Sequence, residues 1–269
     1  MSSNQAMVTP NQSLTFCRTP RANVLGVGVH AVNIPSAIDI LCTAIDEGQK
    51  GYVCVTGVHG IMEAHRNPAF RKSIDEAMLV VPDGMPTVWV GRWQSHKDMR
   101  RVFGPDLMIE LCRESVARGY THFFYGGNPG VADELAVVLR ERVSGLRIVG
   151  TETPPFRPLV ANEKAELKRR MEEVNPDILW VGLSTPKQEL FMNENLADLK
   201  CRIMVGVGAA FDFHTGRLKD SPGWMKAAGL QWLHRLCQEP SRLWRRYLIN
   251  NCSFITKFAL QGLGLREYR

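Results

Sequence analysis

Short apolar runs alternate with amphipathic stretches along the first 216 residues. Seven runs are almost wholly apolar, as parallel strands covered on both faces should be, and they span 24–29, 52–55, 78–81, 122–125, 147–149, 178–182 and 203–207. Between them the apolar positions recur at helical spacing, at 36–47, 59–76, 104–118, 129–143, 161–174 and 186–198. This alternation predicts an α/β fold, a Rossmann-like and mostly parallel sheet with helices on both faces.

The alternation stops after Gly216. Two helices are predicted beyond it, at 221–236 and 240–260, because Pro222 and Pro240 stand where a helix tolerates proline, near its first turn. We therefore divide the chain into a disordered lead-in at 1–22, a Rossmann-like core at 23–216 and a helical appendage at 217–269.

Charge distinguishes the appendage from the core. The whole chain has 33 basic and 27 acidic residues, a net charge of +6. Residues 217–269 hold ten of the basic and three of the acidic residues, so the excess lies in the last fifth of the chain. Such an excess indicates an anionic partner, namely nucleic acid, phospholipid or a phosphorylated substrate.

A helical wheel of residues 242–261 is amphipathic. Its apolar half holds Leu243, Trp244, Tyr247, Leu248, Phe254, Ile255 and Phe258, and its polar half holds Arg242, Arg245, Arg246, Ser253, Thr256 and Lys257. A basic amphipathic helix with Trp and Tyr suits a bilayer interface, which favours contact with a membrane surface. A helix docked on the core would also explain the apolar face.

The cysteines and the hydropathy indicate a cytoplasmic protein. Seven cysteines are scattered without a Cys-x-x-Cys pair, as in reduced cytosolic proteins. No run approaches the ~20 apolar residues of a membrane span. We expect a protein peripheral on the inner face of the cell membrane.

Candidate chemistry lies where the predicted strands end, because ligands of such sheets bind there. Asp83 follows the run at 78–81, and Gly84 allows a tight exit. An acid at this place can act as general base or bind a sugar hydroxyl. The pair Asp-Gly is also a common turn, which is the alternative.

Three further strand ends carry glycine or polar residues. Gly126 and Gly127 precede a helix predicted to have Asn128 as N-cap, an arrangement suited to an anion but also to a plain tight turn. Gly182 is followed by the polar group Lys187, Gln188 and Glu189 at a helix start. Gly206 and Gly208 lack the third glycine of a dinucleotide fingerprint.

Several motifs are missing from the sequence. It has no Asp-x-Asp, which many sugar-nucleotide transferases use to hold a divalent cation, and no phosphate-binding loop of the Gly-x-x-x-x-Gly-Lys type. We therefore expect neither a metal nor a cofactor. A diphosphate would be neutralised by arginines and backbone amides instead.

Taken together, these segments resemble the WecG/TagA/CpsF family of bacterial glycosyltransferases, from about residue 23 to 248. The resemblance rests on PDG at 82–84, RVFGPD at 101–106, GGNPG at 126–130, PDILWVG at 176–182, PKQE at 186–189, GVGAAFDF at 206–213 and QWLHRLCQEP at 231–240. It implies a Rossmann-like core and an inverting, metal-independent transfer from a UDP-sugar to an undecaprenyl-diphosphate-linked acceptor. It also implies that the appendage engages the membrane and completes the active site.

The resemblance assigns roles to individual residues. Asp83 corresponds to the proposed catalytic base, and Arg101 is the second residue expected in the catalytic centre. Thr56 and Gln188 fall on binding positions, and the appendage arginines that reach the phosphates correspond to Arg235, Arg242 and Arg245. The remaining predicted substrate-binding residues are His59, Gly126, Gly127, Asn128, Gly182, Lys187, Glu189, Gly208 and Asp212.

One departure affects the donor sugar. Many members carry Thr-x-Asn at the second strand end, where this chain has Thr56, Gly57 and Val58, followed by His59. The donor is therefore open among N-acetylmannosamine, its uronic acid and other hexoses or hexuronic acids.

Two alternative functions come from other classes. An NAD-dependent oxidoreductase would use the glycine turns, and a non-catalytic module binding nucleic acid would use the basic appendage. The transferase is preferred, with no nucleic acid as partner, because the strand-end acid, the glycines and the arginines make one coherent site. The oligomeric state is open, with a homo-oligomer as one alternative.

Overall fold

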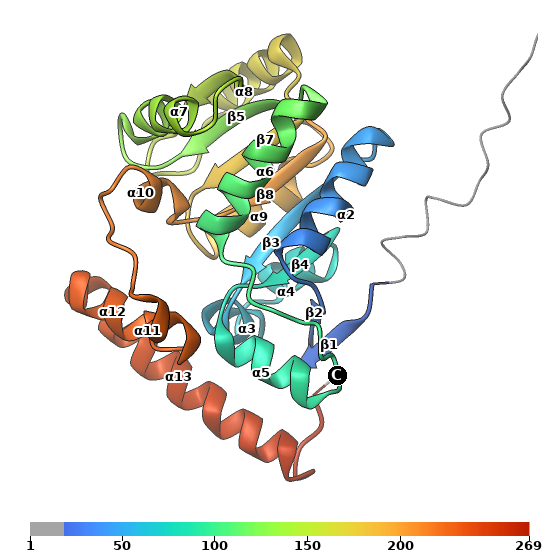
Figure 1. Cartoon of the computed structure of the whole chain (residues 1–269), viewed down its shortest axis with the longest axis vertical. Coiled ribbons are helices and arrows are strands. Elements are labelled where there is room, and N and C mark those ends of the chain that lie inside the picture. Colours follow the sequence, from blue (N-terminus) through green and yellow to red (C-terminus); the bar gives the residue numbers. More distant parts are fainter. Residues whose placement is uncertain (1–18, 269) are drawn as a thin grey trace, which may run out of the picture.

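The computed structural model describes residues 19–268 and has three layers, with a parallel sheet between two layers of helices (Figure 1). The sheet has the order β4-β3-β8-β7-β5-β6, and each neighbouring pair is parallel. Its strands are β3 (Gly51–Thr56), β4 (Leu79–Pro82), β5 (Thr121–Gly126), β6 (Arg147–Glu152), β7 (Ile178–Gly182) and β8 (Ile203–Gly206). The predicted Rossmann-like α/β class is confirmed.

Alternate strand residues face the two helical layers, as the two-residue period of a strand requires. Val53 and Val205 pack on the side of α2 (Ile34–Asp46), α6 (Gly104–Arg118), α7 (Val131–Arg142) and α10 (Ala210–His214). Tyr52 and Met204 pack on the side of α3 (Val58–Ala64), α4 (Pro68–Asp75), α8 (Ala161–Val174) and α9 (Lys187–Asn195). Both faces are buried, which explains why the strands are apolar throughout.

The prediction of a single strand at 24–29 is wrong. The chain there makes a separate antiparallel hairpin of β1 (Arg21–Val24) and β2 (Val27–His30). Leu25 and Gly26 form its turn with φ of 53° and 84°, the conformation that two-residue hairpins need. His30 fixes the hairpin beside β4, since the Val80 amide donates to its Nδ1 at 2.9 Å.

Three helix predictions also differ from the structure. The stretch 59–76 is two helices, α3 and α4, because Pro68 starts a new helix that Asn67 caps through the Phe70 amide at 3.1 Å. Helix α5 (Met85–Trp93) was not predicted, because its aromatic and β-branched residues give no clear helical period. Helix α7 begins after Gly130, so Asn128 is not its N-cap.

The appendage consists of α11 (Gly223–Ala227), α12 (Gln231–Gln238) and the long α13 (Pro240–Gly262), gathered beside α3 and α5 (Figure 1). The predicted helix 221–236 is broken at Gly229, whose φ is +71° and where a Cβ would lie 2.7 Å from Trp89. Helix α13 packs against α3 and α12. No helix within residues 19–268 is long and apolar enough to span a bilayer.

The apolar half of α13 is divided between two environments. Leu243 and Phe254 are buried against the protein, while Trp244, Leu248 and Ile255 are 48%, 58% and 65% exposed. One stripe therefore docks on the core, as one of the two alternatives for this helix states, and a second stripe, roughly 100° around the helix, is uncovered.

Candidate active site

Two adjoining pockets lie at the carboxyl ends of β3 and β4, beneath α12 and α13. The larger has a volume of ≈ 520 Å³ and a largely apolar wall that includes Trp89, Trp232 and Phe258. The smaller, of ≈ 100 Å³, is lined in part by Ser184 and Gln188. Six residues line both pockets: Val55, Asp83, Phe103, Thr185, Arg235 and Arg246.

Asp83 stands at the junction of the pockets. Its amide donates to the Thr56 carbonyl at 3.0 Å, which ties the end of β4 to the end of β3. Its Oδ1 is buried without a hydrogen-bond partner, while the side chain as a whole is 37% exposed because it faces the pockets. Burial raises the pKa of the Asp83 carboxyl, and the nearby Arg101 and Arg235 act against that rise. A carboxylate with a raised pKa that faces a pocket is a candidate general base.

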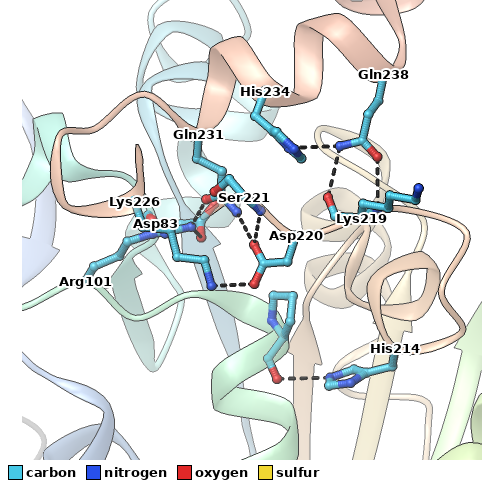
Figure 2. A network of polar contacts seen from close by, with 11 residues as sticks. Asp83, Arg101, His214, Lys219, Asp220, Ser221, Lys226, Gln231, His234 and Gln238 are labelled. Carbon is cyan, nitrogen blue, oxygen red and sulfur yellow. Dashed lines mark hydrogen bonds and ion pairs between the residues drawn. The ribbon is translucent and has the colours of Figure 1, made fainter. Parts of the chain in front are cut away.

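Arg101 connects Asp83 to the appendage (Figure 2). One Nη lies 3.9 Å from Asp83 Oδ1, and Nε donates to the Asp83 carbonyl. The same Nη donates a hydrogen bond to Gln231 Oε1 on α12, and Gln231 in turn donates to Asp220 at 3.1 Å. The guanidinium also lies over the Phe103 ring, 4.1 Å from its centroid. These contacts fix the position of Arg101 and link the core to α12.

Thr56 and His59 lie at the end of β3 and just after it, but of the two only His59 lines a pocket. Thr56 is buried, with an Oγ1 that has no partner among the described residues. His59 lines the larger pocket and accepts at Nδ1 from the Asn250 amide of α13 at 3.0 Å, while Arg66 donates to the Asn250 oxygen at 2.8 Å. Burial lowers the pKa of His59 to about 3, and the positive charge of Arg246 contributes to the same shift, so the ring is neutral.

The three polar residues at the start of α9 differ in burial. Gln188 and Glu189 are buried, and Glu189 Oε1 accepts from Gln188 Nε2 at 3.1 Å and from the Thr185 hydroxyl at 2.8 Å. The hydrogen bond to Glu189 fixes the Gln188 amide at the smaller pocket, where its Oε1 is buried without a partner. Gly208 lies beside Gln188 and also lines this pocket. Lys187 is exposed and lines neither pocket.

The glycine turn after β5 serves packing. The Gly127 amide donates to the Gly182 carbonyl at 3.0 Å, and a Cβ on Gly126 would lie 2.6 Å from the same oxygen. Gly126, Gly127, Asn128 and Gly182 line neither pocket, in agreement with the plain tight turn. Asp212 is half-buried and also lies outside both pockets. Burial raises the pKa of its carboxyl, and the nearby Arg242 opposes this rise.

The appendage supplies three arginines to the pockets, but not the expected set. Arg235 lines both and Arg242 the smaller one, and each is paired with Glu239, at 2.8 and 2.9 Å. Arg245 lines neither pocket and is exposed, with its guanidinium 5.2 Å from the Trp244 ring centroid. The expectation that it reaches the site is corrected by the structure, which places Arg246 there instead.

Sequence reasoning missed Arg246 and Asn250. The signal that could have found them is spacing, because both lie three or four residues from Leu243 or Phe254, on the docked face of α13. Within residues 19–268 no three His, Cys, Asp or Glu side chains gather as metal ligands would.

Comparison with known proteins agrees with this geometry. Residues 22–268 match the sequence profile described as the glycosyl transferase WecG/TagA/CpsF family. The chain belongs to this family. The predicted resemblance is confirmed, and the protein is a glycosyltransferase; the oxidoreductase and nucleic-acid alternatives are set aside.

One relative of this glycosyltransferase has a defined activity. It is the N-acetylglucosaminyldiphosphoundecaprenol N-acetyl-beta-D-mannosaminyltransferase of Bacillus spizizenii, 26% identical over 206 residues. The similar region covers 77% of this chain and 78% of the relative.

Proposed function

We propose that this glycosyltransferase moves a sugar from a UDP-sugar to a polyprenyl-diphosphate-linked acceptor, with inversion and with Asp83 as the base. The observation that carries the proposal is the place of Asp83, at the meeting point of a polar and an apolar pocket. The two substrates differ in polarity as the two pockets do, because a sugar nucleotide is polar and a lipid-linked sugar carries an apolar chain. Their reacting atoms must meet beside the base.

The lining of each pocket supports an assignment of substrates. The donor's polar groups suit the smaller pocket, where Gln188, Arg235 and Arg242 offer an acceptor and two cations. The first isoprene units of the acceptor suit the apolar wall of Trp89, Trp232 and Phe258 in the larger pocket. The name of the Bacillus relative supports a lipid-diphosphate acceptor and makes UDP-N-acetylmannosamine the first donor to test.

The reaction follows from this placement. The Asp83 carboxylate takes the proton of an acceptor hydroxyl as that oxygen forms a bond to the anomeric carbon of the donor. The bond from the anomeric carbon to the diphosphate breaks on the opposite face, which inverts the configuration and releases UDP. Arg101 and the appendage arginines stabilise the charge on the leaving diphosphate.

We also propose that the appendage places the enzyme on the inner face of the cell membrane. The exposed stripe of Trp244, Leu248 and Ile255 offers apolar surface to the bilayer, and Arg245 beside Trp244 offers a cation to anionic headgroups. Each such cation adds about 1 kcal/mol of binding near anionic lipid. The larger pocket, lined in part by α13, would then open where the lipid-linked acceptor arrives.

The test is a panel of UDP-sugars, each incubated with the full chain and a polyprenyl-diphosphate-linked sugar, with released UDP as the readout. We expect UDP release that needs both substrates and that continues in EDTA, because arginines take the place of a cation. Absence of acceptor-dependent UDP release with every donor would contradict the proposed function. Loss in EDTA with recovery on adding Mg²⁺ would contradict the role given to the arginines.

A further inference from the structure

Glu189 is a buried acid beside the site that lines neither pocket. Its side chain belongs to the first turn of α9 and is 1% exposed, whereas the preceding Gln188 is part of the wall of the smaller pocket. The sequence predicted that Glu189 binds substrate, but this position gives it no direct access to a ligand in either pocket. Burying an acid is costly, so its contacts with neighbouring residues indicate its role.

Glu189 acts as a hydrogen-bond acceptor for two neighbours. Its Oε1 accepts from Gln188 Nε2 at 3.1 Å and from the Thr185 hydroxyl at 2.8 Å. Burial raises the pKa of the Glu189 carboxyl, and these hydrogen bonds and the charge of Arg246 oppose that rise. A proton on the neutral acid would sit on Oε2, which has no partner among residues 19–268. Oε1 is therefore an acceptor in both protonation states.

This acceptor determines which end of the Gln188 amide faces the pocket. The oxygen and nitrogen of a glutamine amide have nearly the same shape but opposite hydrogen-bonding character. Because Glu189 Oε1 accepts, it requires the amide nitrogen on its side, and the oxygen then points the other way. Gln188 Oε1 is buried at the smaller pocket and has no partner in the described part of the chain. Gln188 therefore presents an acceptor to a ligand.

Two glycines confine the Gln188 side chain without selecting its orientation. A Cβ on Gly206, the last residue of β8, would lie 3.2 Å from Gln188 Nε2 and 2.7 Å from Met192 Cε. A Cβ on Gly208 would lie 3.5 Å from Gln188 Oε1. The amide is thus held between the two backbones, but a half-turn would exchange its nitrogen and oxygen in the same space. Only the hydrogen bond to Glu189 distinguishes the two orientations.

We propose that Glu189 is a positioning residue, which orients the Gln188 amide so that its oxygen accepts a hydrogen bond from an N–H or O–H group of the UDP-sugar. The inference rests on the proposed function for the ligand and goes further in naming the kind of group that the smaller pocket recognises. That group belongs either to the UDP part, as the uracil N–H or a ribose hydroxyl, or to the transferred sugar. The experiment distinguishes these two sources.

The experiment is a double-mutant cycle in the full chain, with Gln188→Met, Glu189→Met and the double variant. Methionine has a similar length and leaves no amide or carboxyl group. Calorimetry measures affinity for UDP and for the UDP-sugar. Each single variant should weaken binding of the same ligand by roughly 5- to 100-fold, because Glu189→Met lets the amide turn its nitrogen to the pocket. The double variant should bind no more weakly than Gln188→Met, since Glu189 acts through that amide.

Three further measurements separate positioning from a structural role. Glu189→Gln should lose less affinity than Glu189→Met, because a glutamine can still offer its oxygen to Gln188. At saturating donor, kcat of Glu189→Met should stay within a few-fold of the wild type, since Asp83 and Arg101 are unchanged. Without ligand, the Tm of the double variant should be no lower than that of either single variant, because neither buried polar group is left without the other. Glu194→Met, at an exposed position on α9, is the matched control and should leave every value unchanged.

Each outcome has one meaning. Weaker binding of UDP assigns the recognised group to the UDP part, and a loss confined to the UDP-sugar assigns it to the sugar. Unchanged affinity in Gln188→Met or Glu189→Met would overturn the proposal, as would a double variant that binds more weakly than Gln188→Met. Should Glu189→Met not fold, the same cycle with Glu189→Gln applies the same criteria. Failure of the wild type to bind UDP would count against the proposed function itself.

Discussion

The carboxyl of Asp83 is subject to two opposing influences. Burial of its Oδ1 favours the protonated acid, while Arg101 and Arg235 favour the carboxylate. A base must be ionised to take a proton, so activity should fall as the pH falls through the raised pKa of Asp83. The acid limb of the pH profile should therefore lie above the range of an ordinary aspartate.

The Arg101→Met variant tests this balance. Because the cation nearest Asp83 is lost, the pKa of Asp83 should rise further, and the acid limb of kcat/KM should move to higher pH. The maximal kcat/KM should also fall, by roughly 10²-fold, through lost stabilisation of the leaving diphosphate. The measurement is kcat/KM as a function of pH. As a control, Arg113→Met removes an exposed arginine paired with Glu110 on α6 and should leave the pH profile unchanged. An acid limb that stays in place or moves to lower pH in Arg101→Met would contradict this role of Arg101.

Single residues could be predicted where a strand end determines their place. Asp83 and Gln188 follow apolar strands, and parallel strands bring their carboxyl ends together, so both reach the pockets. The glycines at 126 and 127 follow the same rule but serve packing, which depends on how closely β5 and β7 approach. Arg246 was missed in favour of Arg245 because a wheel ordered by polarity places both on the polar side, and only the spacing of Arg246 from the buried Leu243 separates them.

Among the elements, helix α13 has two faces with different surroundings. Its docked stripe holds Asn250 against His59 and places Arg246 in the site. The side chains of its exposed stripe, Trp244, Leu248 and Ile255, are about half or more uncovered by the rest of residues 19–268. The amphipathic pattern predicted the helix and its apolar residues. It could not predict which of them dock, because that depends on the surface of α3 and α5, which are distant in sequence.

The exposed stripe gives a prediction for membrane binding. Replacing Trp244, Leu248 and Ile255 with serine should lower binding to anionic vesicles, most strongly at high salt, where the arginines contribute less. UDP affinity should be retained, since these changes leave Arg235 and Arg246 in place. Sedimentation with vesicles at two salt concentrations provides the measurement. Serine at the exposed Val116, Val137 and Val160 is the matched control, and equal vesicle binding by both triple variants would show that the stripe is not a membrane contact.

At the scale of the whole molecule, one site is assembled from two parts of the chain. The core supplies Asp83 and Arg101, and the appendage supplies Gln231, Arg235 and Arg246. Strand and helix alternation was enough to predict the α/β core, the six strands of its parallel sheet and the strand ends at which the two pockets lie. The closure of that edge by α12 and α13 rests on long-range contacts such as Arg101 with Gln231, which no local pattern encodes.

If Asp83 is the base of a sugar transfer between the two pockets, the Asp83→Asn variant should lose turnover and keep its affinity for UDP. Turnover would be measured as UDP released from the active donor in the presence of vesicles carrying the lipid-linked acceptor, and UDP affinity by calorimetry. Asp39→Asn, an exposed position on α2, is the control. The account predicts that Asp83→Asn lowers turnover by roughly 10²- to 10⁴-fold while UDP affinity stays near that of the wild type. Turnover close to the wild-type value in Asp83→Asn would contradict it.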